Sequence, residues 1–194
     1  MSAADNQDLP KAAGVLVEDH AQVGDLIHEL LAALDDGDKA KSFELLDLLW
    51  ARLAVHIRAE HLCLFPAILD APLTSFTGTG DAPQREEAHN AINLLRDDHD
   101  FFMGEMATAV NNMRKHETVS DLGVINKMLL EVRRTVVGIE TRLDTHNQLE
   151  ENQVYRWADV MLSQTDRATL TARMRRELAN LPPRFTHVGE NSSH

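Results

Sequence analysis

Residues 52–60 read Arg-Leu-Ala-Val-His-Ile-Arg-Ala-Glu, and residues 142–150 read Arg-Leu-Asp-Thr-His-Asn-Gln-Leu-Glu. Both stretches carry Arg-Leu, then a His, then a Glu four positions after the His. Residues four apart on an α-helix share one face, so each pair presents an imidazole and a carboxylate to one point. An aromatic residue follows each Glu five positions later, as Phe65 and Tyr155. The pattern indicates a duplicated helical unit that carries a site.

A shorter repeat precedes each of these stretches. Residues 16–20 read Leu-Val-Glu-Asp-His, and residues 95–99 read Leu-Arg-Asp-Asp-His. One His and Glu pair arises easily by chance, whereas a repeated order of chemical groups does not. The candidate site residues, in chain order, are His20, His56, Glu60, His99, His146 and Glu150.

The composition predicts one helical domain. The chain has 194 residues, 43% of them apolar, which is ample material for a core. Aromatic residues make up only 5%, and Gly and Pro are sparse, a composition that suits helices better than strands. The formal charge of −12 argues against nucleic acid or an anionic membrane as a partner, because both attract clustered Lys and Arg.

Cysteine content and hydropathy bear on the compartment. Cys63 is the only cysteine, which excludes a disulfide framework and a thiolate set for zinc or an iron–sulfur cluster. No apolar run approaches the length of a membrane span, and residues 1–10 lack the features of a signal peptide. We therefore expect a cytoplasmic protein.

Apolar residues at spacings of three and four predict four long helices. These helices lie at about 16–34, 46–66 with an extension to 70, 86–116 and 122–150. A connection at 71–85, which contains two Pro and two Gly, separates the two repeats. Long helices with mostly short connections form an antiparallel four-helix bundle, so the fold class is all-α.

An additional short C-terminal helix is expected at about 165–181. It begins with a capping signal at Ser163 to Asp166 and ends at two consecutive prolines, Pro182 and Pro183. The chain is thereby divided into a flexible tail at 1–13, one domain at 14–181 and a flexible tail at 182–194.

All four long helices place a His on their apolar stripe, and this pattern argues for metal. A single His is most often a surface residue or a hydrogen-bonded core residue. Four imidazoles and two carboxylates in a bundle core would cost on the order of several kcal/mol per unpaired charge. A pair of metal cations removes that cost.

The number of donors indicates how two metals share the site. If both Glu residues bridge the metals, the first two His complete one metal and the last two complete the other. A bridging oxide or hydroxide adds a fifth donor and leaves one position open on each metal. This donor set suits two non-haem iron ions best, with manganese or zinc as weaker alternatives, and the open positions suit a small diatomic ligand or peroxide.

Neighbouring residues have weaker assignments. Glu151 is an alternative to Glu150 as the bridging carboxylate, although the repeat favours Glu150. Arg52 and Arg142 either stabilise the bridging carboxylates or a bound anion, or are ordinary exposed arginines. Core packing around the site is the simplest interpretation of Met103, Met106, Cys63, Phe65 and Tyr155, with a redox role as the alternative for Tyr155.

The other histidines fall off the apolar stripes or near the end of the chain. We interpret them as non-ligands; they are His28, His61, His89, His116, His187 and His194. A ferritin-type di-iron bundle needs two Glu-x-x-His pairs. Only Glu86 and His89 form such a pair, away from the stripe, so we reject that interpretation.

The order His, His-x-x-x-Glu, His, His-x-x-x-Glu resembles that of the hemerythrin-like family, also called the HHE cation-binding domain. The resemblance covers about residues 15–181. It includes Leu64-Phe65-Pro66, which commonly follows the first motif in this family. It implies a four-helix bundle with a non-haem di-iron site held by the six candidate residues.

One position departs from the oxygen-carrying hemerythrins. Those proteins have a fifth His four residues after the third ligand His, where this chain has Met103. The departure argues against reversible oxygen carriage. The four-His, two-Glu set is more similar to members linked to nitric oxide and iron–sulfur cluster repair, although the cysteine-bearing segment common in that group is not found in this sequence.

The sequence leaves the function open between binding and catalysis. A binding protein would capture oxygen or nitric oxide, or buffer iron. An enzyme would turn over peroxide or nitric oxide with electrons from a separate donor. The lack of a proton-donating residue on the stripes beside the site favours binding, and a structural bundle with a zinc pair is the third alternative.

Overall fold

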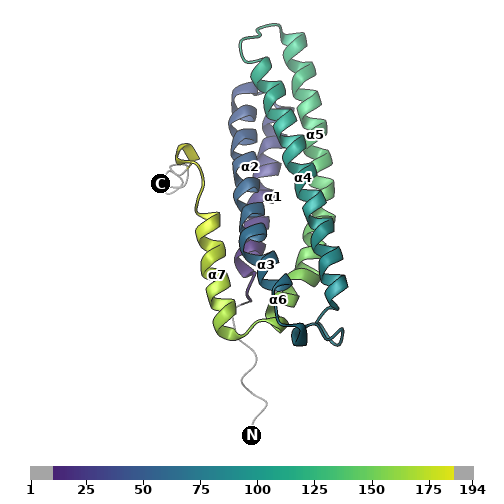
Figure 1. Ribbon diagram of the computed structural model, residues 1–194. Helices are drawn as coiled ribbons and strands as arrows, with labels where there is room; N and C mark the ends of the chain where they lie inside the picture. Colours follow the sequence, from purple (N-terminus) through teal and green to yellow (C-terminus); the bar gives the residue numbers. More distant parts are fainter. Residues whose placement is uncertain (1–10, 186–194) are drawn as a thin grey trace.

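The computed structural model describes residues 11–185, which form four long helical rods (Figure 1). Neighbouring rods run in opposite directions, which confirms the predicted all-α antiparallel bundle. The rods are α1 (Gly14–Asp35); α2 (Lys39–Ala59) with η1 (Glu60–Leu64) and α3 (Phe65–Leu69); α4 (Arg85–Lys115); and α5 (Leu122–Leu149) with η3 (Glu150–Val154) and α6 (Tyr155–Met161).

The second and fourth rods each contain one π-helical turn, η1 and η3, in which hydrogen bonds close five residues apart. In the second rod this turn accommodates Pro66, whose ring would clash with a carbonyl four residues earlier in a regular helix. The carbonyl of Leu62 accepts a hydrogen bond from Arg173 at 3.0 Å instead. The second rod therefore continues through Pro66 to Leu69, in agreement with the predicted extension of this helix to about residue 70.

Local sequence signals set the ends of the rods. Gly37 turns the chain between α1 and α2 with a φ of 73°, a conformation that favours glycine. The side chains of Asp38 and Asp121 cap α2 and α5 by accepting hydrogen bonds from backbone N–H groups. The Pro- and Gly-containing connection ahead of α4 holds only one short 3-10 turn, η2 (Leu73–Ser75).

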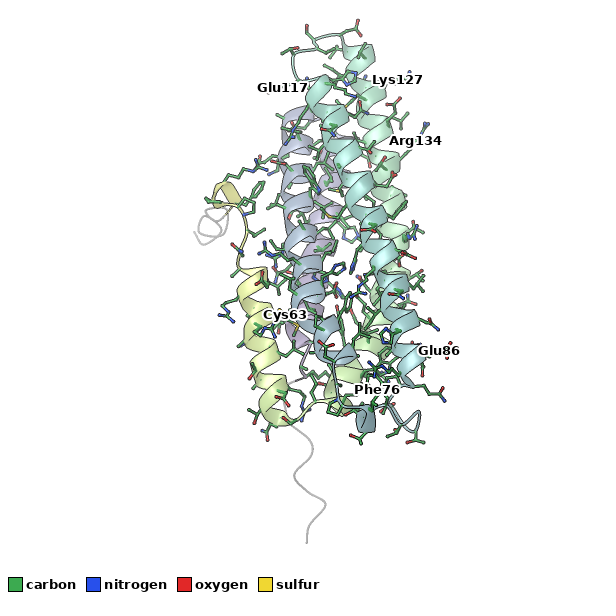
Figure 2. All side chains as sticks on the ribbon, viewed as in Figure 1. Cys63, Phe76, Glu86, Glu117, Lys127 and Arg134 are labelled. Carbon is green, nitrogen blue, oxygen red and sulfur yellow. The ribbon has the colours of Figure 1, made fainter. Side chains whose placement is uncertain are left out.

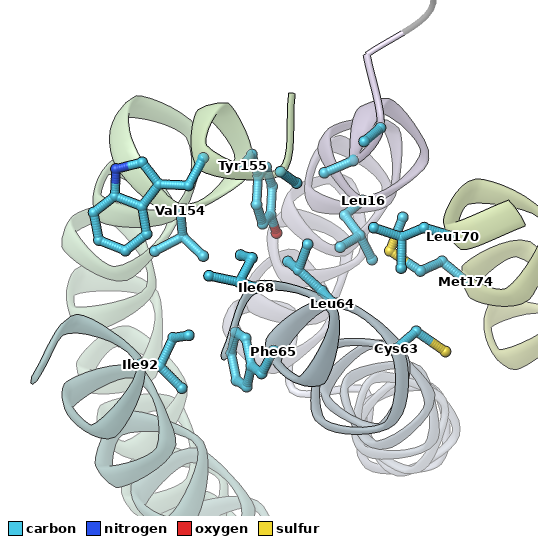
Figure 3. Close-up of a cluster of buried hydrophobic side chains, with 14 of the residues drawn as sticks. Leu16, Cys63, Leu64, Phe65, Ile68, Ile92, Val154, Tyr155, Leu170 and Met174 are labelled. Carbon is cyan, nitrogen blue, oxygen red and sulfur yellow. The ribbon is translucent and has the colours of Figure 1, made fainter. Parts of the chain in front are cut away.

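Helix α7 (Gln164–Leu178) packs along α2 outside the bundle, as Figure 1 shows. Ser163 caps it by accepting from the backbone N–H of Asp166, in agreement with the predicted capping signal. Its buried residues Leu170 and Met174 contact the lower core (Figure 3). This helix is the predicted C-terminal addition to the bundle.

The bundle interior consists of two apolar clusters with a polar layer between them. The lower cluster lies near the η1 and η3 turns and includes Phe65 and Ile92 (Figure 3). The upper cluster fills the rest of the bundle and includes Leu46 and Phe102. On each rod the candidate His lies between residues of the lower cluster and residues of the upper cluster. The four His therefore lie at the same level of the bundle, in the polar layer.

Of the two segments predicted as flexible tails, residues 1–10 and 186–194 lie outside the described part of the chain. Ala12 and Ala13 are buried in the lower cluster, and the N–H of Ala12 donates to Asp159 at 2.8 Å. At the other end, η4 (Pro183–Phe185) follows α7, and Arg184 pairs with Asp47 at 2.9 Å. Residues 11–13 and 182–185, which the prediction assigned to the tails, are thus part of the described structure.

The outer faces of the rods carry charged side chains together with a few exposed apolar ones, such as Leu94 and Leu130 (Figure 2). Figure 2 shows Lys127 and Arg134 projecting from α5 away from the bundle. Within residues 11–185, no helix combines the length and the apolar character that crossing a membrane would need.

Replacing Leu46 by Ala tests the upper cluster. Leu46 is fully buried, so we expect the free energy of unfolding to fall by about 2–5 kcal/mol. Leu130→Ala is the matched control: that side chain is 48% exposed, and its loss should change stability by less than about 0.5 kcal/mol. Chemical denaturation of both variants measures the difference, and similar losses in the two would contradict the described core.

Candidate metal centre

The six candidate residues converge in the polar layer. They form two groups of four, each with its donor atoms within 4.8 Å of one another. Glu60 and Glu150 belong to both groups. The first group adds the His residues of α1 and α2, and the second adds those of α4 and α5; the groups are His20, His56, Glu60, Glu150 and Glu60, His99, His146, Glu150.

The two shared carboxylates are the most deeply buried members. Both Glu side chains are 0% exposed, and His56, His99 and His146 are nearly as inaccessible. The side chain of His20 is 9% exposed and is the most accessible of the six. The layer is therefore closed on most sides and approaches the surface beside His20.

An aspartate orients one His of each group. Asp19 accepts a hydrogen bond from His56 Nδ1 at 2.8 Å, and Asp98 accepts one from His146 Nδ1 at 3.1 Å. A carboxylate only accepts, so each Nδ1 carries a proton and each Nε2 faces the layer, where it can bind a metal once it has given up its own proton. Carboxylate and histidine pairs of this kind fix the ring of a metal-ligating His and raise its basicity.

Arginines from the two long repeats complete these pairs. Arg52 binds Asp19, and Arg142 Nε donates to Asp98 at 2.6 Å. Their described carboxylate partners are thus the orienting aspartates rather than the two shared glutamates, and these contacts show that they are more than ordinary exposed arginines. Both aspartates directly precede a candidate His in the short repeat, and that repeated position is the signal by which sequence reasoning could have found them.

The other His of each group is contacted by the residue that follows a shared Glu. Glu151 lies 2.8 Å from His20 Nδ1, and Nε2 of His61 lies 2.9 Å from His99 Nδ1. Glu150 rather than Glu151 belongs to both groups of donors. His61, although outside the groups, contacts the centre, which its position off the apolar stripe did not indicate.

The π-helical turns place an aromatic ring over each half of the centre. Each turn starts at a shared Glu, whose carbonyl accepts the N–H of the aromatic residue five positions later. Phe65 is fully buried and stacks on His99 with ring centroids 6.0 Å apart. Tyr155 stacks on His20 at 5.8 Å.

The hydroxyl of Tyr155 reaches into the layer. It donates to Glu60 Oε1 at 2.9 Å or to Glu150 Oε2 at 3.0 Å, and it lies 3.2 Å from His20 Nε2. The interpretation of Tyr155 as simple core packing is therefore incomplete. The expectation that no proton donor stands beside the site is also wrong, because this phenol is one.

The electrostatics of the layer favour ionised carboxylates beside charged imidazoles. Burial disfavours the charged form of His56, but Glu60 and Asp19 outweigh it and raise the pKa of His56 from 6.5 to about 10. Burial likewise opposes ionisation of Glu60, yet His56 holds its pKa well below the usual value. Burial, reinforced by both Glu residues, raises the pKa of Tyr155 well above 10, so the phenol keeps its proton.

The donor set fits metal cations. Glu60 Oε2 and Glu150 Oε1 are buried and have no hydrogen-bond partner among residues 11–185, although His99 Nε2 faces the former at 3.2 Å and His146 Nε2 faces the latter at 3.2 Å. The Nε2 atoms of His20 and His56 face each other at 3.2 Å. Ligand bonds of about 2.1 Å separate opposite donors by about 4.2 Å, close to the span of each group. A cation in each group would satisfy these atoms together.

Several neighbouring residues lie outside the donor groups. Met103 and Met106 contribute to the upper cluster, and Cys63 is a buried, free thiol in the lower one, as expected for packing. His28 and His116 pair with Glu140 and with the carbonyl of Asn112, away from the centre. His89 is exposed on α4, and His187 and His194 lie outside the described residues.

Comparison with known families agrees with this geometry. The family model "Hemerythrin HHE cation binding domain" matches residues 12–158, which include all six candidate residues and most of the chain. Neither a search of curated proteins nor a search of solved structures gave a match. The match ends at residue 158, within α6, so the family model covers all but the last turn of the four rods and does not include α7.

Replacing Asp98 by Ala tests the orienting role of the aspartates. Loss of the carboxylate frees the ring of His146, so we expect metal affinity to fall by about 10–100-fold. Asp97→Ala is the matched control, since Asp97 is the preceding residue and is exposed. Competition with a chelator measures both affinities, and equal values for the two variants would contradict the role given to Asp98.

Proposed function

The chain belongs to the hemerythrin HHE cation-binding domain family, and we propose that its polar layer holds two iron ions that bind a small ligand. The observation that carries the proposal is the sharing of two buried carboxylates between two donor groups. Shared carboxylates suit a pair of closely spaced cations rather than one. In this proposal each iron has two His ligands of one group, and Glu60 and Glu150 bridge them.

The chemistry of the donors favours iron over other metals. Imidazole and carboxylate ligands suit non-haem iron, while manganese and zinc are weaker alternatives. Every ligand in the two groups is a nitrogen or oxygen donor, and the single thiol, Cys63, lies outside them. An oxide or hydroxide bridge between the irons belongs to the same proposal.

When bound, a pair of irons supplies open positions for oxygen, nitric oxide or peroxide and can exchange electrons with them. The protein provides the rest. Asp19 and Asp98 hold two of the imidazoles with Nε2 towards the layer. The two apolar clusters exclude bulk water above and below, which strengthens electrostatic interactions in the layer.

A redox enzyme is the second candidate, and Tyr155 favours it. Reduction of peroxide or nitric oxide by an electron donor consumes protons, and disproportionation of peroxide moves protons from one peroxide molecule to the other. The buried hydroxyl of Tyr155 stands within hydrogen-bond distance of both shared carboxylates, where it could relay such protons. General acids in such positions accelerate reactions by about 10²–10⁴-fold. Support of iron–sulfur cluster repair belongs with this candidate, whereas iron buffering or a structural metal site would make no use of the hydroxyl.

The proposed partners follow from the site and the surface. They are a small diatomic ligand or peroxide and, for an enzyme, an electron donor. The net charge of −12 argues against nucleic acid and anionic membranes, and a single cysteine suits a reducing compartment such as the cytoplasm.

Metal analysis of two ligand variants tests the proposed assignment. His56→Ala and Glu150→Ala remove donors from one group and from both groups, so we expect each variant to contain less iron than the wild type after expression with added iron. His89→Ala is the control, because His89 is exposed and outside both groups. Elemental analysis should give close to two irons per chain for the wild type and for the control. Equal loss in all three variants, or zinc alone in the wild type, would refute the assignment.

Tyr155→Phe separates binding from catalysis. The substitution keeps the ring and removes the hydroxyl, so iron content should stay unchanged while the steady-state loss of peroxide or nitric oxide slows at least about tenfold. The measurement uses iron-loaded wild type and variant side by side. Equal rates would exclude Tyr155 as the proton donor, and no turnover by the wild type would leave ligand binding as the function.

A further inference from the structure

A surface cleft of about 440 Å³ lies beside the centre, between the first turns of α1 and the η3–α6 segment. Gly14 and Val17 line its α1 wall, and Asn152 lies on the opposite wall. Tyr155 and Glu151 also line it. These last two residues contact the centre directly, so they separate the cleft from the metal-binding layer.

The contacts of these two residues show how thin the separation is. The Tyr155 hydroxyl lies 3.2 Å from His20 Nε2, and the Glu151 carboxylate lies 2.8 Å from His20 Nδ1. His20 is also the candidate ligand whose side chain is most exposed, at 9%. The side chains of Glu151 and Tyr155 therefore separate the cleft from the first donor group.

The aromatic residue that corresponds to Tyr155 in the other half of the bundle is buried and lines none of the described clefts. Phe65 replaces Tyr155 there, is fully buried in the lower apolar cluster and stacks on His99. The guanidinium of Arg96 covers the Phe65 ring at 5.8 Å from its centroid. The two halves have the same kinds of ligand and one orienting aspartate each, but the aromatic residue lines a cleft in the first half and is buried in the second.

We propose that this cleft is the entrance by which the small ligand reaches the centre, and that it delivers the ligand to the group containing His20 and His56. The inference rests on the proposed function and adds the route and the receiving half. Glu151 is the movable element, because its side chain is 39% exposed and has a single described partner, His20. Tyr155 is fixed by its contacts with both shared carboxylates.

The entrance limits the class of ligand. In this proposal the opening is made by the displacement of one carboxylate, that of Glu151, so it suits a molecule of two or three heavy atoms rather than a larger substrate. Three acidic and two basic side chains line the cleft, so its charges nearly balance and do not concentrate anions. The ligand that fits is small, such as a diatomic gas, hydrogen peroxide or a narrow ion such as azide.

Blocking the cleft with a large ring tests the route. Val17 is 40% exposed on one wall, and Asn152 is exposed on the other, so Val17→Trp and Asn152→Trp each fill the cleft without disturbing the core. The probe is azide, a narrow three-atom ligand whose binding to iron-loaded protein is followed optically by stopped flow. The control is Leu130→Trp, which places the same ring on an exposed site of α5 outside the cleft.

We expect both cleft variants to bind azide at least about tenfold more slowly, with unchanged iron content and unchanged equilibrium affinity. An obstructed path slows association and dissociation alike, whereas a damaged centre would alter affinity or iron content. Wild-type rates in both iron-loaded cleft variants, or equal slowing in the control, would overturn the route alone. Absence of iron from the wild type would overturn the proposed function and the route together.

Discussion

Two carboxylates excluded from water at the middle of a helical bundle are the constraint on which the rest of the structure depends. Glu60 and Glu150 have no exposed surface, and burying an ionised carboxylate is costly unless charge and hydrogen bonds compensate. Four imidazoles at the same level compensate the charge of the carboxylates, and aspartates orient two of these imidazoles. Apolar clusters cover the layer on both sides. This arrangement is the one expected of a site that binds cations, because cations would neutralise the carboxylates and bind the imidazoles at the same time.

The duplication in the sequence gives the centre an approximate symmetry. The positions at which the two halves differ determine which chemical groups adjoin each donor group. His, Glu and Asp recur in both halves with the same contacts. The residues after the shared carboxylates do not recur: a phenol and a carboxylate adjoin His20, whereas Phe65 and an imidazole adjoin His99. The half with His20 has a phenol that also lines a cleft, whereas the half with His99 has a buried phenyl ring at the same place, so the two donor groups have different surroundings.

Sequence reasoning predicted the four rods because apolar spacing is local, and it predicted the six candidate residues because both motifs repeat. The π-helical turn after Glu150 could not be predicted, since no proline marks it, whereas Pro66 hinted at the turn after Glu60. The turn after Glu60 contains His61 and departs from regular α-helical spacing. A prediction from regular spacing therefore placed His61 off the apolar stripe and missed its contact with His99. The partners of Arg52 and Arg142 were missed because they depend on how neighbouring rods are aligned, which periodicity within one helix does not specify.

A crystal structure of iron-loaded protein, with anomalous scattering recorded at the iron edge, tests the central claim most directly. The account predicts two iron peaks, one beside His20 and His56 and the other beside His99 and His146, with Glu60 and Glu150 in contact with both. One peak, or two peaks that do not share both carboxylates, would contradict the account.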